Sequence, residues 1–393
     1  MVYVSKFRNN FCALSKRQYK VLAMESSCDD SCVSIISDKG EVLYNKKETL
    51  ADVIKSGGVQ PNLATVHHLA TIPILVQDAL SKTNSKLDGE DIKMICVTRG
   101  PGMPTCLTAS YQFAKGLAVA NPKLKFVGVH HMLGHLLTSS MEFLELLEKP
   151  FLSLLVSGGH TQLVLTENIT KHTILIDMEG QKAVGDSLDK CARLLKFKGD
   201  MIAKEMELFI QSQNLPLDDP KYFKELARAS NPFTKPLAKG ENVYAKKFCF
   251  SGLDSQLRSH INKKVIKVDE LTDFEKAEWA YRIQHVHFQH IMDKIKLQFA
   301  ETPELEKLPL VISGGVSANM YLRGYCERQL NNKMYYPKHL HLCTDNSVMI
   351  GWAGLKMYEK TKLVNTMNST VISKWPLSDL MTVDGAVKDK TPL

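Results

Sequence analysis

The sequence predicts an α/β protein composed of two related halves, and two observations carry this prediction. A short apolar run, a small polar turn and a second apolar run occur twice, over residues 19–36 and again over residues 151–165. Strand-like and helix-like segments alternate after these hairpins, which is typical of a mixed α/β sheet. With 393 residues, 44% of them hydrophobic, the chain is long enough for two or three domains with their own cores.

The first hairpin opens the N-terminal half, which we assign to residues 21–150. Its apolar runs are residues 19–24 and 32–36, and the polar segment from Glu25 to Ser31 is its tip. The elements expected after it are a helix over residues 63–80, a strand over 94–98, a Gly-Pro turn, a helix over 107–119 and a strand over 126–129.

The second hairpin opens the C-terminal half, which we assign to residues 151–355. Its apolar runs are residues 151–156 and 163–165. A further strand is expected over residues 308–312, where a Ser-Gly-Gly turn opens another helix.

A helical insertion interrupts this second half. Residues 182–300 are rich in Lys, Glu and Gln and predict helices, broken by a proline-rich connection over residues 215–236. Residues 356–393 are expected to form a C-terminal helix and tail.

The charge balance permits a nucleic-acid partner without requiring one. The formal charge is +8, but the 50 basic and 42 acidic residues are spread along the chain. Phosphates would be met by basic residues of the helical region, for example Lys246, Lys247, Arg258, Lys263 and Lys264. Lysines on a helical surface are as often simply solvated.

Cysteine spacing and hydropathy bear on the compartment. The nine cysteines include no C-x-x-C pair, which argues against a zinc ribbon and a secreted disulfide framework. The absence of 18 consecutive apolar residues predicts no membrane insertion. Residues 1–20 carry five basic residues and no acid, which resembles the end of a mitochondrial presequence. The alternative is a basic leader without a targeting function.

Two glycine turns are candidate phosphate sites. Ser157-Gly158-Gly159 follows a strand, and its amides can approach an anion because no Cβ intervenes. Gly314-Gly315 lies between a strand and a helix, so helix N-terminal amides can face a ligand, with Asn319 near its ribose or base. The alternatives are an ordinary tight turn and a helix-start hydrogen bond from Asn319.

A pair of histidines has the spacing of metal ligands. His131 and His135 are four residues apart, so they share one face of a helix. Asp345 lies in a turn-like acidic segment and is a candidate third ligand. A zinc protease would place a glutamate directly after the first histidine as its general base, whereas this chain has Met132.

Seven motifs, spread from residue 25 to residue 346, together resemble one enzyme family. They are Glu25-Ser26-Ser27-Cys28-Asp29, Gly100-Pro101-Gly102, His130-His131-Met132-Leu133-Gly134-His135, Leu155-Val156-Ser157-Gly158-Gly159-His160-Thr161-Gln162, Ser251-Gly252-Leu253, Ser313-Gly314-Gly315-Val316-Ser317-Ala318-Asn319 and Cys343-Thr344-Asp345-Asn346. Their order and spacing resemble the TsaD family of tRNA threonylcarbamoyl transferases. The two hairpin-led halves likewise resemble the two-lobed actin, hexokinase and Hsp70 (ASKHA) fold, in which both hairpin tips face phosphates.

The resemblance implies an activity and a set of site residues. It implies transfer of threonylcarbamoyl from threonylcarbamoyl-AMP to N6 of adenosine 37 in tRNAs that read codons beginning with A. It implies one divalent metal ion per subunit, iron or zinc, bound by His131, His135 and Asp345. It also implies contacts to the adenylate from Leu155, Val156, Ser157, Gly158, Gly159, Asp189, Gly199 and Asn319.

The chain departs from the family pattern at a few positions. Asp189 and Lys190 keep the end of one motif, while the loop around Gly199 is shorter than the usual Pro-Gly-Gly-Pro. Leu155 replaces the metal-binding tyrosine of archaeal and cytosolic members, and His160 replaces their asparagine. Both features resemble the bacterial and organellar branch, so we expect a mitochondrial enzyme.

The implied chemistry is acyl transfer to a weakly nucleophilic amine, so positioning and electrostatics should dominate. Asp29 or Asp30 can accept the amine proton, although either can instead hydrogen-bond its own turn. We further expect a functional link to a threonylcarbamoyl-AMP synthase, and a homodimer, because no additional modules are recognisable. The alternatives are an ATP-dependent small-molecule kinase of the same superfamily and a non-catalytic nucleotide-binding scaffold.

Overall fold

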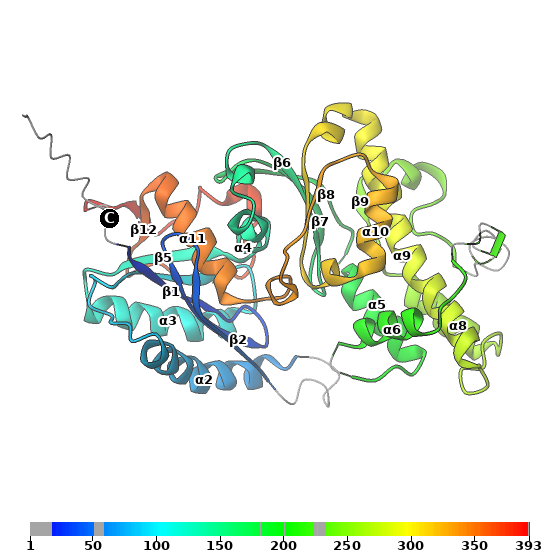
Figure 1. The fold of residues 1–393 in the computed structure, drawn as a ribbon, viewed down its shortest axis with the longest axis horizontal. Coiled ribbons are helices and arrows are strands. Elements are labelled where there is room, and N and C mark those ends of the chain that lie inside the picture. Colours follow the sequence, from blue (N-terminus) through cyan, green and yellow to red (C-terminus); the bar gives the residue numbers. More distant parts are fainter. Residues whose placement is uncertain are drawn as a thin grey trace, which may run out of the picture.

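The computed structural model describes residues 18–50, 59–180, 182–199, 201–217, 219, 221–222, 226, 233–391 and 393. Two lobes lie side by side along the long axis of the molecule, each built on its own sheet (Figure 1). Apart from residues 18–20, the predicted basic leader lies outside the described residues.

The N-terminal lobe contains a five-stranded sheet in the order β3-β2-β1-β4-β5. Strands β1 and β2 form the predicted antiparallel hairpin, and β4 and β5 continue parallel to β1. The strands are β1 Lys20–Glu25, β2 Asp30–Ser37, β3 Val42–Thr49, β4 Ile92–Gly100 and β5 Lys125–His130.

Both faces of this first sheet are covered, which explains why its central strands are continuously apolar. Helices α2 (Pro61–Lys82) and α3 (Pro104–Ala120) share one core with Leu22 and Met24 of β1. The neighbouring residues Val21 and Ala23 point to the opposite face, where helix α11 (Ser347–Thr361) packs.

The C-terminal lobe contains a six-stranded sheet in the order β11-β10-β6-β7-β8-β9. Strands β6 and β7 form the second predicted hairpin. The strands are β6 Phe151–Val156, β7 Thr161–Asn168, β8 Lys171–Met178, β9 Lys247–Phe248, β10 Leu310–Ser313 and β11 Met334–Tyr335. Strands β8, β9 and β11 were not predicted, and β9 lies inside the segment expected to be helical.

The helices of this lobe lie in and after the predicted insertion. They are α5 Val184–Leu194, α6 Ile202–Ser212, α8 Leu253–Asn262, α9 Asp273–Glu301 and α10 Met320–Gln329. A capping box between Thr272 and Glu275 starts α9, whose centre is buried in the lobe core. The short 3₁₀ turns are η1 Ser139–Met141, η2 Leu144–Leu147, η3 Gly240–Tyr244, η4 Pro303–Lys307, η5 Gly315–Ala318, η6 Leu340–Leu342 and η7 Leu377–Asp379.

The two sheets share one plan. When the strands of each half are numbered in chain order, β1 to β5 give the order 3-2-1-4-5, and β6, β7, β8, β10 and β11 give the same order. In both halves the first three strands are antiparallel and the last two are parallel to the first. The sequence repeat of two hairpins therefore reflects two lobes with the same topology.

The helix after the fifth strand of each half joins the lobes. Helix α4 (His131–Thr138) follows β5 yet also contacts β6 and β10, and it packs against α11. Helix α11 straddles the predicted boundary at residue 355 and packs on the first sheet, because its apolar residues cover the face left open by α2 and α3. The tail after it contacts the first lobe through β12 (Leu363–Asn365), which pairs with β13 (Ala386–Lys388), and contacts β8 of the second lobe through η7.

Helix α2 has the length and composition of a membrane span. Core helices of soluble proteins pass the same test, and α2 buries Ile72, Leu75 and Val76 in the first core.

Candidate functional site

A cavity of about 980 Å³ opens between the lobes, and both hairpin tips reach it. The N-terminal lobe contributes the β1–β2 tip, the loop of Pro101, Gly102 and Met103, and His131 at the start of α4. The C-terminal lobe contributes the β6–β7 tip, Gly315, Thr344 and Asp345. Tertiary structure therefore brings together motifs that are up to 318 residues apart in sequence (345 minus 27).

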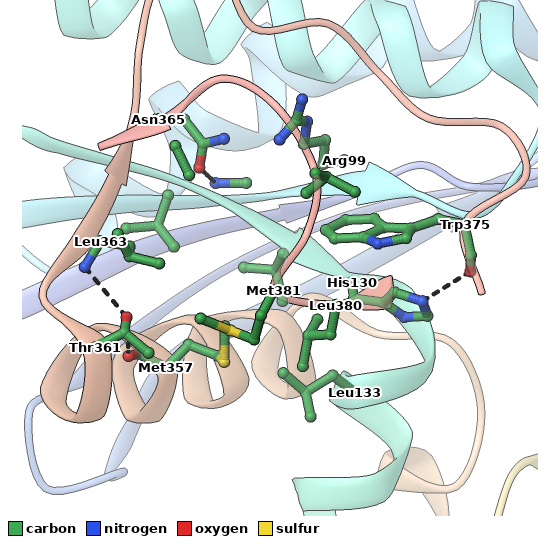
Figure 2. A pocket seen from close by; sticks show the side chains of 15 residues that line it. Arg99, His130, Leu133, Met357, Thr361, Leu363, Asn365, Trp375, Leu380 and Met381 are labelled. Carbon is green, nitrogen blue, oxygen red and sulfur yellow. Dashed lines mark hydrogen bonds between the residues drawn. The ribbon is translucent and has the colours of Figure 1, made fainter. Parts of the chain in front are cut away.

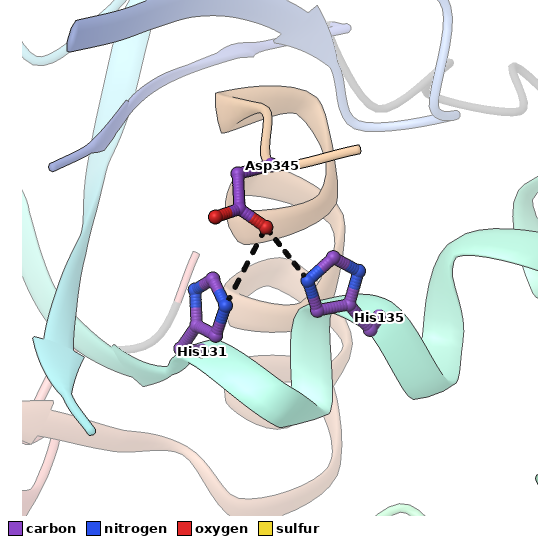
Figure 3. A group of neighbouring side chains, drawn as sticks. All are labelled: His131, His135 and Asp345. Atoms are coloured by element: carbon purple, nitrogen blue, oxygen red, sulfur yellow. Dashed lines mark hydrogen bonds and ion pairs between the residues drawn. The ribbon is translucent and has the colours of Figure 1, made fainter. Parts of the chain in front are cut away.

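Two histidines and one aspartate converge at the wall of this cavity (Figure 3). His131 and His135 lie one turn apart on α4, which is wholly buried. The Oδ1 atom of Asp345 lies 3.0 Å from His135 Nε2 and 3.6 Å from His131 Nε2. Possible ligand atoms of the three residues lie within 4.8 Å of one another, so one ion can contact all three.

Glu25, at the end of β1, fixes the orientation of His131. Its Oε2 atom lies 3.2 Å from His131 Nδ1 and accepts a hydrogen bond from Thr98 Oγ1, while its Oε1 atom accepts one from Ser27 N at 2.6 Å. A carboxylate on the far nitrogen of an imidazole is the usual outer partner of a metal-binding histidine. The donor set of two imidazoles and one carboxylate, supported in this way, fits a divalent metal such as zinc or iron.

The electrostatics of the cluster reflect two carboxylates around one imidazole. Burial lowers the pKa of His131, but the charges of Glu25 and Asp345 outweigh it and raise this pKa to about 9. Burial also opposes ionisation of Asp345, yet the neighbouring His131 and His135 hold its pKa well below the usual range.

Two of the backbone N–H groups in the glycine turn of the second lobe already donate hydrogen bonds within the turn. Ser157 N donates to His160 O at 2.8 Å, and Gly159 N donates to Ser157 Oγ at 3.2 Å. Within the described residues no acceptor is found for Gly158 N. An ideal Cβ on Gly158 or Gly159 would meet no atom within 4 Å, so the turn leaves open space for a ligand. Leu155 and Val156 place their side chains in the hydrophobic cores, so only their backbone is available.

A second cavity of about 260 Å³ continues from the first, and the two share Gly158, Met201, Gly315 and Thr344. Asp189 and Asn319 line it, but both also cap helices. Asp189 Oδ1 accepts from Ala203 N at 2.9 Å at the start of α6. Asn319 Oδ1 accepts from Leu322 N at 2.9 Å, and its Nδ2 donates to Gln284.

The two candidate bases have different surroundings. Asp30 Oδ2 forms an ion pair with Lys47 at 2.9 Å, and its Oδ1 accepts a hydrogen bond from Thr49 at 2.5 Å. Burial raises the pKa of Asp30 despite these contacts. Asp29 lines the larger cavity at the hairpin tip. Gly199 lies before α6 and lines neither cavity within the described part of the chain.

Comparison with known proteins identifies the family of this site. A sequence model of the TsaD family, tRNA N6-adenosine threonylcarbamoyltransferase, matches residues 41–352. The chain belongs to this family. It therefore transfers a threonylcarbamoyl group to N6 of adenosine in tRNA. Its two lobes of matching topology agree with the expected two-lobed ASKHA fold. This family match does not favour the kinase alternative.

Individual relatives align over nearly the whole chain. The mitochondrial tRNA N6-adenosine threonylcarbamoyltransferase of Schizosaccharomyces pombe is 32% identical over 401 residues, covering 96% of this chain and 91% of that protein. The Rickettsia massiliae transferase is 34% identical over 373 residues, covering 92% and 99%. Among solved structures, component A of the Acidaminococcus fermentans (R)-2-hydroxyglutaryl-CoA dehydratase aligns over 87% of this chain and 98% of its own, with 16% identity and a TM-score of 0.47.

Sequence reasoning missed several residues of the candidate site. Glu25 belongs to the first of the seven motifs, and its role follows only from its burial beside His131, because a buried acid needs a partner. Lys204 and Glu207 line the smaller cavity as an ion pair at 2.7 Å. His160 lines the larger cavity with its ring 6.4 Å from that of His131, and burial lowers its pKa to about 4, so it is neutral at pH 7.

The basic residues predicted to meet tRNA fall into two groups. Lys246 is paired with Glu301, and Lys247 lies 3.9 Å from Glu179, so part of their charge is already balanced. Arg258, Lys263 and Lys264 are exposed on and directly after α8.

Proposed function

We propose that the transferase uses threonylcarbamoyl-AMP as its donor and modifies adenosine 37 of tRNAs that read codons beginning with A, assisted by one divalent metal ion, iron or zinc, per subunit. The observation that carries the proposal is the convergence of His131, His135 and Asp345 at a cavity also lined by both hairpin tips. The family shows the transfer reaction, and the geometry supports a site between the lobes for it.

The two connected cavities suit the two parts of the adenylate. The smaller cavity, lined by Asp189 and Asn319, would take the nucleoside. Gly158 lies where the cavities meet, so its backbone N–H would face the phosphate. The threonylcarbamoyl group would then extend toward the histidine cluster in the larger cavity, where tRNA has access.

The residues of the larger cavity supply the remaining chemistry. When bound, the metal would act as a Lewis acid toward phosphate and carbamoyl oxygens. Asp29 is our candidate for accepting the proton of the adenosine amine, because Lys47 and Thr49 occupy the carboxylate of Asp30. Asp29→Asn should then lower kcat with little change in donor affinity. A kcat that falls only in Asp30→Asn would reverse this assignment.

The test of the proposal is reconstitution. Purified transferase, synthetic threonylcarbamoyl-AMP and an unmodified tRNA transcript should yield threonylcarbamoyladenosine, together with stoichiometric metal by elemental analysis. The double variant His131→Ala, His135→Ala should fold, lose the metal and lose most of the activity. Undiminished metal in that variant would refute the ligand assignment. Phosphorylation of a small molecule without tRNA modification would instead support the kinase alternative, and nucleotide binding without turnover would support the scaffold alternative.

We also propose that the transferase is a homodimer that pairs through α2 and α3. Residues 61–77 contain no charged side chain, yet Leu63, Val66, Leu69 and Ile74 are between 45% and 64% exposed. An apolar groove of about 350 Å³ lies between Leu69 and the start of α3. An uncharged face of this kind marks a contact surface, and a two-fold axis would pair it with its own copy.

Light scattering tests the dimer. Leu69→Glu should produce monomers at concentrations at which the wild type is dimeric. Val265→Glu is the matched control, because Val265 is similarly exposed at 61% but follows α8 in the other lobe. An active, strictly monomeric wild type would contradict the proposal.

The compartment and the donor supply complete the proposal. The S. pombe relative is named mitochondrial, and residues 1–20 are basic and lack acids, so we propose a mitochondrial enzyme supplied by a threonylcarbamoyl-AMP synthase. Fluorescence of a C-terminal fusion outside mitochondria would contradict this location. Loss of the synthase should abolish the modification in that compartment.

A further inference from the structure

The chain segment between β12 and β13 runs across the back of the loop that follows β4, residues 101–103. We call residues 366–380 the strap. Ile372 N donates to Arg99 O at 2.8 Å, and Gly102 N donates to Ser373 O at 3.2 Å. Arg99 Nε donates to Thr370 O at 2.7 Å. The strap is therefore hydrogen-bonded to the end of β4 and to the loop that follows it.

Gly100 shows how closely the strap approaches this loop. A Cβ on Gly100 would lie 1.8 Å from Ile372 O, so no side chain fits between the two backbones. The following residues, Pro101, Gly102 and Met103, line the catalytic cavity. The strap thus supports from behind a loop whose front faces the substrates.

The strap also reaches the metal-ligand helix through His130 (Figure 2). His130 Nε2 lies 2.9 Å from Trp375 O, and the two rings are 4.7 Å apart. His130 Nδ1 accepts a hydrogen bond from Met132 N at 3.1 Å, so His130 is the N-cap of α4. The N–H of Met132 requires a bare Nδ1, which places the proton on Nε2, where it is donated to Trp375.

We propose that His130 is a positioning residue that transmits the strap's position to the metal site. The next residue, His131, is the first of α4, and His135 lies one turn later. Fixing the first turn of α4 from the strap fixes the direction in which both imidazoles point toward Asp345. This inference rests on the metal-assisted function proposed above and adds a residue outside the ligand set.

Three variants separate positioning from general stability. His130→Phe keeps an aromatic ring beside Trp375 and removes both hydrogen bonds, whereas His130→Asn keeps an N-cap acceptor and loses the reach to Trp375. His172→Phe is the matched control. His172 is also buried, lies 3.1 Å from Thr166 Oγ1 and 3.0 Å from the carbonyl of Ile169, and is located on β8.

The readout is the affinity of each folded, metal-stripped variant for Zn²⁺, measured by equilibrium dialysis, beside its melting temperature. We expect roughly tenfold weaker Zn²⁺ binding in His130→Phe, a smaller loss in His130→Asn and wild-type affinity in His172→Phe. Wild-type Zn²⁺ affinity in both His130 variants would overturn the inference. The metal site itself would still be supported if the double variant His131→Ala, His135→Ala no longer binds Zn²⁺. Should His130→Phe not fold, His130→Asn alone decides. Zn²⁺ binding unaffected by the loss of His131 and His135 would overturn both proposals.

Discussion

The two lobes share a sheet topology but present different chemistry to the cleft between them. The first hairpin tip carries Asp29 and Asp30, whereas the second carries Gly158 and Gly159. The first tip thus offers charged side chains, and the glycines of the second offer backbone amides and open space. A repeated fold therefore need not imply a repeated function, because loops diverge while the sheets that position them are retained.

The proposed metal ligands show the opposite relation, because His131 and Asp345 occupy equivalent places in the two halves. His131 directly follows β5, the fifth strand of the first half, and Asp345 follows β11, the fifth strand of the second. The helices that come next, α4 and α11, pack against each other. A single ion at this point would join the two lobes at the place where their topologies correspond.

The largest effect is expected on Zn²⁺ affinity, and it should differ between Asp345, the proposed ligand from the second lobe, and Glu25, the outer partner from the first. Asp345→Asn should weaken Zn²⁺ binding by more than Glu25→Gln, since loss of an outer partner of a metal ligand typically costs about 10–100-fold. Asp30→Asn is the control, because it changes a carboxylate at the same hairpin tip without touching His131. Equal affinities for Glu25→Gln and wild type would remove Glu25 from the site.

Acid should destabilise the C-terminal lobe through three histidines of α9. Burial lowers the pKa of His285 and His287 to about 4 and that of His290 to about 3. Below about pH 6.5 the unfolded chain binds protons that the folded chain excludes, so the free energy of unfolding falls as pH drops from about 6.5 toward 4. At pH 5 each histidine should cost roughly 2 kcal/mol.

Urea denaturation at pH 7 and pH 5 measures this effect. The variant His290→Gln keeps an acceptor for Cys249 N, which donates to His290 at 3.0 Å in the wild type. It should show a smaller loss of stability between the two pH values. Indistinguishable losses would mean that His290 does not contribute.

A smaller effect is expected at the glycine turn of the second lobe. Gly158→Val should leave the fold intact, because the new side chain enters open space, and should weaken binding of a non-hydrolysable adenylate analogue by roughly tenfold, or about 1.4 kcal/mol. The affinity of Gly158→Ala for the analogue should lie between those of the wild type and Gly158→Val. Calorimetry showing equal affinity across this series would exclude the turn from the donor site.

The smallest effect concerns the basic residues of the second lobe. Lys263→Glu with Lys264→Glu should weaken binding of all tRNAs alike. It should also lower the slope of log affinity against log salt by the amount that up to about two phosphate contacts contribute. Lys246→Glu with Lys247→Glu should change less, because Glu301 and Glu179 already balance part of that charge. Modification rates across a salt series provide the measurement. Unchanged salt slopes in both variants would place tRNA docking elsewhere.

The sequence by itself determined the local features of this transferase. Apolar periodicity and turn residues within short windows predicted both hairpins and the helices α2 and α3. The spacing of His131 and His135 placed both on one face of α4. Together with the order of the motifs, these features were sufficient to identify the fold and the family.

Only the tertiary structure decided which of these features meet. Glu25 lies 106 residues from the histidine it orients, and the strap lies 245 residues from the His130 that it contacts. Strand β9 and the edge strand β11 are only two residues each, so they are defined by pairing with a neighbour and not by a pattern of their own. Helix α11 follows the strands of the second half in sequence, yet it packs on the first sheet, where α2 and α3 leave one face to cover. Periodicity reports which face of an element is buried, whereas the choice of partner depends on packing between residues distant in sequence.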